Sequence, residues 1–221
     1  MIKKLFLAQA SLWLVVAAAA WAQIYPSSSA PSSRAAWDFE DAPLSALPSG
    51  AEAVRGSWEI RELAEAPAGA KVLVQTARNR GATFNLLVFS EPQLKDVDLR
   101  VQLKALEGRE DQGGGLVWRY QNAGNYYIAR ANPLENNFRV YKVVDGRRVL
   151  LHSARLALSP SWHTLRVSMR GNRIECFFDG RSYLKLMDDT FSGAGSIGLW
   201  TKADAITAFD SLSVEQLGEI P

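Results

Sequence analysis

The chain has 221 residues, of which 25 are basic, 23 are acidic and 48% are hydrophobic. This length is enough for one domain held together by its own core. The formal charge of +2 gives no support for a nucleic-acid or anionic-membrane partner, because neither sign of charge dominates. Cys176 is the only cysteine, so an intrachain disulfide is excluded, and the segment around it predicts a buried, unreactive thiol beside Ile174 and Phe178.

The N-terminus has the pattern of an export signal. Lys3 and Lys4 precede an apolar run over residues 5–20, and Ala20-Trp21-Ala22 fits a small-x-small cleavage site. We therefore expect a signal helix over residues 1–22, cleavage after Ala22, export to the periplasm or the extracellular space, and no stable membrane anchor in the mature chain. A single transmembrane anchor is the alternative, but the run is short for a bilayer and no basic flank follows it. Loss of the two lysines would leave 23 basic residues against 23 acidic ones.

Residues 23–34 are rich in serine and proline and predict a flexible linker. A single domain is expected over residues 35–217, followed by a short tail over residues 218–221. Most segments of this domain alternate apolar and polar residues, which is typical of half-buried strands. The expected strands are 57–62, 71–76, 83–89, 96–106, 115–120, 125–131, 137–144, 147–152, 162–170, 173–178, 182–187, 195–201 and 206–214.

Turn signals fall between these segments. Asp145-Gly146, Gly171-Asn172 and Asp179-Gly180 are pairs that supply the positive φ angles of tight hairpins. Within residues 96–104 the apolar side chains occupy every second position. No segment after the signal sustains a helical pattern for three turns. About a dozen strands in one domain predict an all-β fold, a two-sheet jelly-roll sandwich.

The run GGGLVWRYQNAGNYYIARANPLENNFRVYKVVDGRR over residues 113–148 carries a resemblance to a known family. With the later segments WHTLRV, FFDGRSYLKLMDDTF and GSIGLWTKADAITAFDSLSV, it resembles secreted bacterial domains with the concanavalin-like, or laminin-G-like, jelly roll. The resemblance covers about residues 36–216 and includes the 3-keto-disaccharide hydrolase domain, a group similar to family 16 glycosidases. It implies a concanavalin-like sandwich but no single activity, because this fold hosts lectins, hydrolases and adhesion modules.

The chain lacks the paired carboxylates of family 16, which uses an E-x-D-x-(x)-E strand to aim them into one cleft. Asp96 and Asp98 are the nearest match, but the third acid is missing and a solvated strand face is the favoured interpretation. Glu107, Glu110 and Asp111 cluster in a loop, where they could supply an acid or base or have no role. Ordinary family 16 chemistry is therefore not expected. A pair of catalytic carboxylates assembled from distant strands remains an open alternative.

Other catalytic patterns are also missing from the sequence. The two histidines, His152 and His163, show neither a Ser-His-Asp spacing nor a metal-binding pair. His163 is expected to face outward if Trp162 faces inward. The glycines of residues 113–115 precede a strand rather than a helix, so they predict a bulge or a close ligand approach instead of a phosphate loop.

Calcium is the cofactor that the resemblance brings into consideration, because jelly rolls of this kind often hold one structural ion near their terminal strands. Asp38, Glu40 and Asp210 are the candidate ligands, since calcium prefers carboxylate and carbonyl oxygens. Polar residues at a sheet edge are the alternative interpretation, and no dense D-x-D-x-D-G loop is present.

Alternation along residues 115–143 makes a polar and aromatic sheet face available. The candidate ligand-binding residues on this face are Arg119, Tyr126, Arg130, Asn132, Arg139, Tyr141, Trp200 and Lys202. Aromatic rings contact the C–H faces of sugars, and Arg and Asn hydrogen-bond to their hydroxyls. A solvated face is the alternative, and Trp118 or Trp200 could belong to the core.

The leading hypothesis is an exported, non-catalytic module that binds a glycan or a related small polar ligand on this face. A hydrolase acting on a glycoside or a 3-keto-disaccharide is the enzyme hypothesis, which follows from the resemblance alone. A protein-interaction or adhesion module is the third. The three differ in whether the face binds sugar, cleaves it, or meets another protein.

Overall fold

A computed structural model describes residues 33–218, which contain fifteen strands and no helix. The predicted signal peptide, the linker up to residue 32 and the tail beyond residue 218 lie outside the described residues. The strands are β1 (Arg34–Trp37), β2 (Ala51–Arg55), β3 (Trp58–Glu62), β4 (Lys71–Gln75), β5 (Phe84–Leu94), β6 (Val97–Glu107), β7 (Gly114–Asn122), β8 (Asn125–Asn132), β9 (Asn137–Val144), β10 (Arg147–Arg155), β11 (His163–Arg170), β12 (Arg173–Phe178), β13 (Arg181–Met187), β14 (Gly195–Lys202) and β15 (Ile206–Gln216). Residues 33–218 provide no helix with the length and hydropathy needed to span a membrane.

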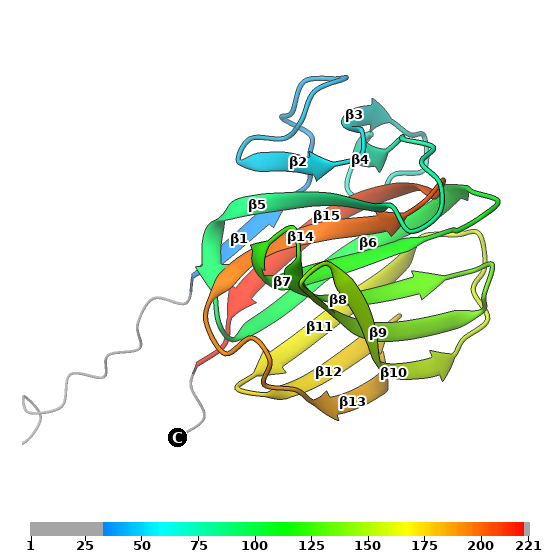
Figure 1. The fold of residues 1–221 in the computed structure, drawn as a ribbon. Coiled ribbons are helices and arrows are strands. Elements are labelled where there is room, and N and C mark those ends of the chain that lie inside the picture. Colours follow the sequence, from blue (N-terminus) through cyan, green and yellow to red (C-terminus); the bar gives the residue numbers. More distant parts are fainter. Residues whose placement is uncertain (1–32, 219–221) are drawn as a thin grey trace, which may run out of the picture. The chain divides into compact units, whose positions relative to one another are not determined.

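The strands form two antiparallel sheets that pack face to face, which confirms the all-β sandwich (Figure 1). The eight-stranded sheet has the order β13-β12-β11-β6-β15-β4-β3, with β1 also paired to β15. The seven-stranded sheet has the order β10-β9-β8-β7-β14-β5-β2. The last long strand, β15, therefore lies in the middle of its sheet beside strands from the first half of the domain.

The main core lies between the two sheets and consists of alternate residues of nearly every strand. The β6 residues in this core are the apolar ones at every second position, Val97, Leu99, Val101 and Leu103. This confirms the alternation predicted from the sequence. Trp118 and Tyr127 of the other sheet stack in this core with ring centroids 5.4 Å apart. Cys176 is fully buried there, and burial raises the pKa of its thiol, as expected of an unreactive cysteine.

The expected strands and turns agree with the structure, with two omissions. Asp145 and Asp179 have φ angles of 49° and 47°, and the glycine after each is also at positive φ, so both tight turns are confirmed. Strands β1 and β2 were not expected. Both are short, and their partial burial gives only a weak alternation of apolar and polar residues.

The seven-stranded sheet curves strongly, and this curvature creates the candidate site. Arg148 is the second residue of the edge strand β10, whereas Phe84 begins β5, five strand spacings away. In a flat sheet the two backbones would be about 24 Å apart. Instead the Arg148 guanidinium lies 5.4 Å from the centroid of the Phe84 ring. The outer face of this sheet is therefore concave.

Candidate ligand-binding site

The concave face of the seven-stranded sheet encloses a hollow of about 550 Å³, within the size range of small-molecule sites. We call it the concave hollow. Its lining comes from both edges of the sheet and from the β7–β8 and β9–β10 turns. The lining residues are Val54, Arg55, Ala82, Phe84, Leu86, Ala123, Tyr126, Gly146, Arg147, Arg148 and Lys202. Apolar and cationic side chains thus share the hollow, and none of these residues is acidic.

Arg148 stands at the centre of three aromatic rings. Its guanidinium carbon lies 4.5 Å from the ring centroid of Tyr141, 5.4 Å from that of Phe84 and 5.7 Å from that of Trp200. Such contacts are favourable because the ring faces carry partial negative charge. The Nη1 atom of Arg148 is buried and has no hydrogen-bond partner among residues 33–218. Burial, which removes water from the guanidinium, lowers the pKa of Arg148.

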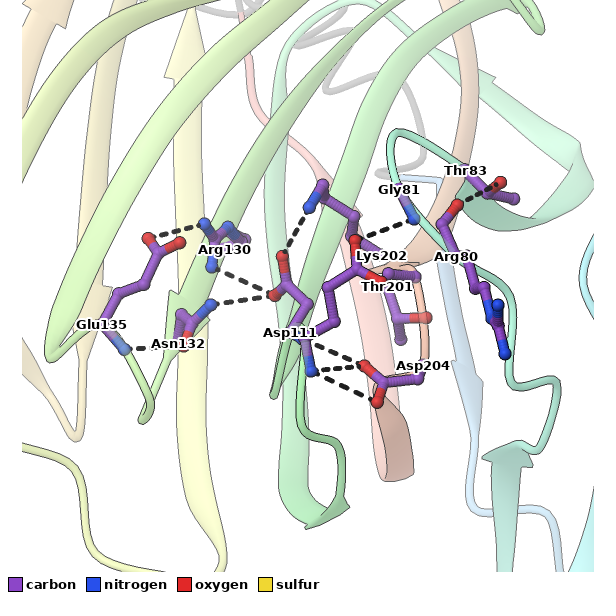
Figure 2. Close-up of polar contacts among 12 residues, drawn as sticks. Arg80, Gly81, Thr83, Asp111, Arg130, Asn132, Glu135, Thr201, Lys202 and Asp204 are labelled. Carbon is purple, nitrogen blue, oxygen red and sulfur yellow. Dashed lines mark hydrogen bonds and ion pairs between the residues drawn. The ribbon is translucent and has the colours of Figure 1, made fainter.

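A buried carboxylate, Asp111, borders the concave hollow. It accepts hydrogen bonds from Asn132 Nδ2 at 2.8 Å and Lys202 Nζ at 3.2 Å, and Arg130 Nη1 lies 3.5 Å away (Figure 2). Burial raises the pKa of Asp111, although the charges of Arg130 and Lys202 act in the opposite direction. Lys202 therefore connects this carboxylate to the lining of the hollow.

Glu135 lies on the opposite side of Arg130 from Asp111, as Figure 2 shows. Its carboxylate accepts hydrogen bonds from Arg130 Nη2 at 3.0 Å, Arg139 Nη1 at 2.9 Å and Asn137 Nδ2 at 2.8 Å. Burial alone would raise the pKa of Glu135, but the Asn137 hydrogen bond and the two arginine charges outweigh it and lower that pKa. One guanidinium thus holds two carboxylates whose pKa values are shifted in opposite directions.

The loop that carries Asp111 is held from below by Asp204. The Asp204 carboxylate accepts backbone N–H hydrogen bonds from Arg109 at 2.8 Å, Glu110 at 3.0 Å and Asp111 at 3.0 Å (Figure 2). Burial acts to raise the pKa of Asp204, and these three N–H groups lower it to a net value below the ordinary one. A carboxylate with three N–H donors fixes the loop conformation, so Asp204 positions Asp111 without touching the hollow.

Arg119 does not belong to the concave face, contrary to the sequence prediction. Its backbone has a φ of 46°, where the pairing of β7 with β8 shifts register, and this bulge turns the side chain away. The buried guanidinium donates to the carbonyls of Lys95, Gly171 and Phe191 at 2.6 to 2.7 Å, and to Asp96 at 3.2 Å. Arg119 therefore ties loops of the sandwich together, and a ligand cannot reach it.

The other predicted residues do lie on the concave face or at its border, but most are covered. Tyr126 and Trp200 are fully buried in a small apolar cluster on this face. Burial raises the pKa of Tyr126 to about 12. Arg130 and Asn132 are buried in the network around Asp111. The more accessible members of the predicted set are Arg139 and Lys202, at 32% and 19% side-chain exposure, while Tyr141 is largely covered by Arg148.

Sequence reasoning missed several residues that form the hollow. Arg55, Phe84 and Arg148 line it from strands that are distant in the chain, and only the curvature of the sheet brings them together. Asp111 was noted as a loop acid, but nothing in the sequence distinguishes it from its neighbours. The Arg147-Arg148 pair after the Asp-Gly turn was the one available signal, because it places two cations at the tip of a hairpin.

The remaining acidic candidates are separated by the fold. Glu110 accepts the Gly81 N–H, and Glu107 pairs with Arg78 on the surface. Asp96 accepts the Gly171 N–H in the turn network of Arg119, and Asp98 pairs with Arg166 on the eight-stranded sheet. None of these four carboxylates lines the concave hollow.

The sequence has no Ser-His-Asp spacing, but the fold brings a serine, a histidine and an aspartate near one another. His163 Nδ1 lies 2.8 Å from Asp179, and Nε2 lies 3.1 Å from the hydroxyl of Ser159. However, Nε2 also lies 3.0 Å from the Ser159 carbonyl oxygen, which can only accept a hydrogen bond. The Ser159 hydroxyl and carbonyl thus lie against the same ring nitrogen, and none of these residues lines the concave hollow. The arrangement fastens the loop before β11 to the β12–β13 turn, and the His163 ring packs toward Phe178 in the core at 4.8 Å.

The three residues proposed for calcium do not fit that ion. Glu40 accepts the Lys71 N–H at 2.7 Å, and Asp210 accepts the Ala68 N–H at 2.9 Å. Asp38 accepts the backbone N–H of Glu40. One oxygen of Asp38, one of Glu40 and both of Asp210 therefore accept backbone N–H groups, and no group of three or more potential metal-ligating side chains occurs within residues 33–218. A second hollow of about 520 Å³ lies on the eight-stranded sheet, but its lining contains no aromatic ring.

No family model matches the chain, and no curated protein matches it. Solved structures do. The carbohydrate-binding module CBM66 from Bacillus subtilis is 20% identical with a TM-score of 0.63, and the match covers 76% of this chain and 96% of that one. A Bacteroides ovatus mixed-linkage glucan GH16 protein, in complex with a G4G4G3G product, is 10% identical with a TM-score of 0.58, covering 81% and 99%. The GH43 BlXynB protein from Bacillus licheniformis is 16% identical with a TM-score of 0.59, covering 82% of this chain but 39% of that one. At these identities the likeness shows the fold, which is the concanavalin-like sandwich that the sequence predicts.

Proposed function

We propose that the protein is a carbohydrate-binding module whose ligand occupies the concave hollow. The observation that carries this proposal is the combination of apolar and hydrogen-bonding groups in one hollow of suitable size. Sugars present C–H faces and hydroxyl groups together, so a site for them needs both kinds of contact. The fold likeness to a module named for carbohydrate binding supports the same conclusion.

The lining divides these contacts between its residues. Val54, Phe84 and Leu86 offer apolar surface for the C–H groups of a sugar ring. Arg147 and Arg148 offer planar hydrogen-bond donors that match neighbouring hydroxyls. Of the residues predicted from sequence, Lys202 lines the hollow with a partly exposed side chain, whereas Tyr126 belongs to the lining but is fully buried. Arg130 and Asn132 contact Asp111, the ion-pair partner of Lys202, and Tyr141 and Trp200 contact Arg148.

A glycan array followed by titration calorimetry of the purified protein tests this proposal. We expect binding to at least one glycan, and Phe84→Ala should weaken it about tenfold, because loss of an aromatic contact of about 1.4 kcal/mol has that effect. Met187→Ala is the matched control, since Met187 is an exposed apolar side chain on the eight-stranded sheet. Absence of binding across the array, or an unchanged affinity for Phe84→Ala, would contradict the proposal.

A glycoside hydrolase is the second candidate, and the pair Asp111 and Glu135 favours it. Both carboxylates bind nitrogens of the same Arg130 guanidinium, so their oxygens lie within about 9 Å, a spacing that inverting glycosidases use. Their pKa values are shifted in opposite directions, as in a pair with separate acid and base roles.

The two candidates differ in whether sugar is released. Incubation with glycosides and 3-keto-disaccharides, followed by chromatography of the products, would detect hydrolysis. Glu135→Gln should abolish any such activity, whereas Glu107→Gln, a surface carboxylate outside the site, should retain it. Glycan binding without any released product would support the binding module and contradict the hydrolase hypothesis.

Export remains part of the proposal and rests on residues 1–22 alone. Mass spectrometry of the protein purified from envelope and medium fractions tests it. We expect a mature N-terminus at Gln23, because cleavage is predicted after Ala22. An intact N-terminus in a membrane fraction would support the anchor instead.

A further inference from the structure

The concave hollow concentrates positive charge in a protein that is otherwise nearly balanced. Four of its lining residues are cations: Arg55, Arg147, Arg148 and Lys202. Over the whole chain, 25 basic residues face 23 acidic ones. An even mixture would therefore place acidic residues among the lining as well, and it contains none. Charges of one sign gathered in a concave, partly apolar site produce a strong local potential.

Most of these cations also lack a direct ion-pair partner. Among residues 33–218, no carboxylate forms an ion pair with Arg55, Arg147 or Arg148, and only Lys202 has one, with Asp111 at 3.2 Å. Elsewhere on the same sheet Arg130 and Arg139 do have carboxylate partners. The three arginines of the hollow thus differ from their neighbours in lacking a partner.

Arg148 has the geometry of an anion-binding group. The ring of Tyr141 covers its planar guanidinium at 4.5 Å, which fixes its orientation, and Phe84 and Trp200 lie on adjacent sides. Its Nη1 atom is buried, and no hydrogen-bond acceptor for it occurs among the described residues. The Arg148 side chain as a whole is only partly buried, and none of its nitrogens forms a hydrogen bond or ion pair with a described residue. The accessible part of the guanidinium can therefore donate to an oxyanion supplied by a ligand in the hollow.

We propose that the ligand of the concave hollow is an acidic glycan, whose anionic group binds Arg148 with Arg55, Arg147 and Lys202 around it. This inference rests on the proposed carbohydrate-binding function and specifies its ligand class. A carboxylate of a uronic acid and a sulfate ester offer the same chemistry, namely a compact oxyanion with several acceptor atoms. The apolar lining contacts the sugar ring that carries the anion.

Calorimetry with charge-matched ligand pairs tests the inference. The uronate arm uses oligogalacturonate and oligoalginate, each beside its neutral methyl ester, and the sulfate arm uses a carrageenan oligosaccharide beside its desulfated form. We expect an acidic ligand to bind at least about tenfold more tightly than its neutral counterpart. Raising the salt from about 0.05 to 0.5 M should weaken the acidic ligand and leave the neutral one nearly unchanged.

Variants locate the anion site. Arg148→Ala should reduce affinity for the acidic ligand about tenfold or more and abolish its advantage over the neutral form. Arg147→Ala, at an exposed position that should tolerate the change, should reduce it by a smaller factor and keep the inference testable if Arg148→Ala fails to fold. Arg173→Ala, an exposed arginine at the hollow on the other sheet, is the control and should change nothing.

The outcomes separate this inference from the proposed function. Equal or tighter binding of neutral glycans overturns the acidic ligand but leaves a carbohydrate-binding module. Acidic binding that survives both Arg147→Ala and Arg148→Ala overturns the assigned site. Absence of binding to any glycan, neutral or acidic, overturns both.

Discussion

The guanidinium of Arg148 on β10 lies 4.5 Å from the ring centroid of Tyr141 on the neighbouring strand β9. The same guanidinium lies 5.7 Å from the ring centroid of Trp200 on β14, three strands beyond Tyr141. The ring faces that the sequence suggested for sugar stacking are therefore occupied by a cation of the protein itself. A ligand entering the concave hollow meets an arginine edge backed by aromatic rings, rather than a bare aromatic platform. The chemistry of the site is then set as much by charge as by apolar contact.

Tyr141 should matter to binding through its ring and not through its hydroxyl. Tyr141→Phe keeps the face under Arg148, and we expect its glycan affinity to stay within about twofold of the original protein, whereas Tyr141→Ala should lose about tenfold because Arg148 is no longer held. Titration calorimetry measures both. Equal losses in the two variants would show that the hydroxyl contacts the ligand and that the stacking is incidental.

Asp111 should contribute strongly to stability. Asp111→Ala leaves Arg130 and Lys202 partly uncompensated beside a buried cavity, so we expect the free energy of unfolding to fall by about 3 to 5 kcal/mol. Urea unfolding measures the change. Glu107→Gln removes an exposed pair with Arg78 and should cost about 1 kcal/mol or less. A loss for Asp111→Ala as small as that of the control would mean that solvent already screens the network.

Arg119 should be a structural residue with no part in binding. Arg119→Met removes the donor for three loop carbonyls and leaves Asp96 without its cation, so we expect a loss of about 3 to 5 kcal/mol in the free energy of unfolding. Arg100→Met, at an exposed position on β6, is the matched control and should be nearly neutral. Glycan affinity of any folded Arg119 variant should be unchanged; a selective loss of affinity would return Arg119 to the site.

Asp188 should make the protein sensitive to acid. Burial acts to raise the pKa of this carboxyl, but hydrogen bonds from Lys142, Thr190 and Tyr127 outweigh it, and the pKa falls from 3.8 to about 2. A lowered acid pKa stabilises the folded state above the unfolded-state pKa, and this contribution of about 2 kcal/mol disappears as the pH falls from about 4 to 2.

The test compares unfolding curves over that pH range. Asp188→Asn should lose the contribution at neutral pH and show a flatter dependence below pH 4, whereas Asp189→Asn, an exposed neighbour, should follow the original protein. Asp111 and Asp210, whose pKa values are raised by burial, give a slope of opposite sign, so only the difference between variants isolates Asp188. Parallel curves for Asp188→Asn and the original protein would refute the assignment.

The thiol of Cys176 should be protected by the fold. It is fully buried between the sheets, and burial raises its pKa, so the reactive thiolate is scarce as well as inaccessible. We expect a thiol reagent to label the native protein at least about a hundredfold more slowly than the urea-unfolded protein. Fast labelling under native conditions would show that β12 and the edge strand β13 beside it open readily.

Local pattern determined the elements of this protein. Alternation with a period of two assigns one side of each strand to a core, and Asp-Gly pairs adopt the positive φ angles that tight turns require, so the strands from β3 to β15 and most of their turns follow from neighbouring residues. The short strands β1 and β2 were not predicted from the sequence, because their pairing depends on β15 and β5, which lie far along the chain.

The site, in contrast, was decided by tertiary structure. Alternation predicts which side of a strand a residue occupies, but neither how deeply the side chain is buried nor how the sheet curves. It therefore could not predict that Trp200 and Tyr126 are covered, or that a bulge turns the Arg119 side chain away from the concave face. The curvature of the seven-stranded sheet, summed over five strand spacings, brings Arg148 to Phe84. Residue pattern alone predicts the sandwich and the set of aromatic and cationic side chains on one face. The packing of that face into a hollow determined which of them a ligand can reach, because burial and long-range pairing depend on residues that are distant in the chain.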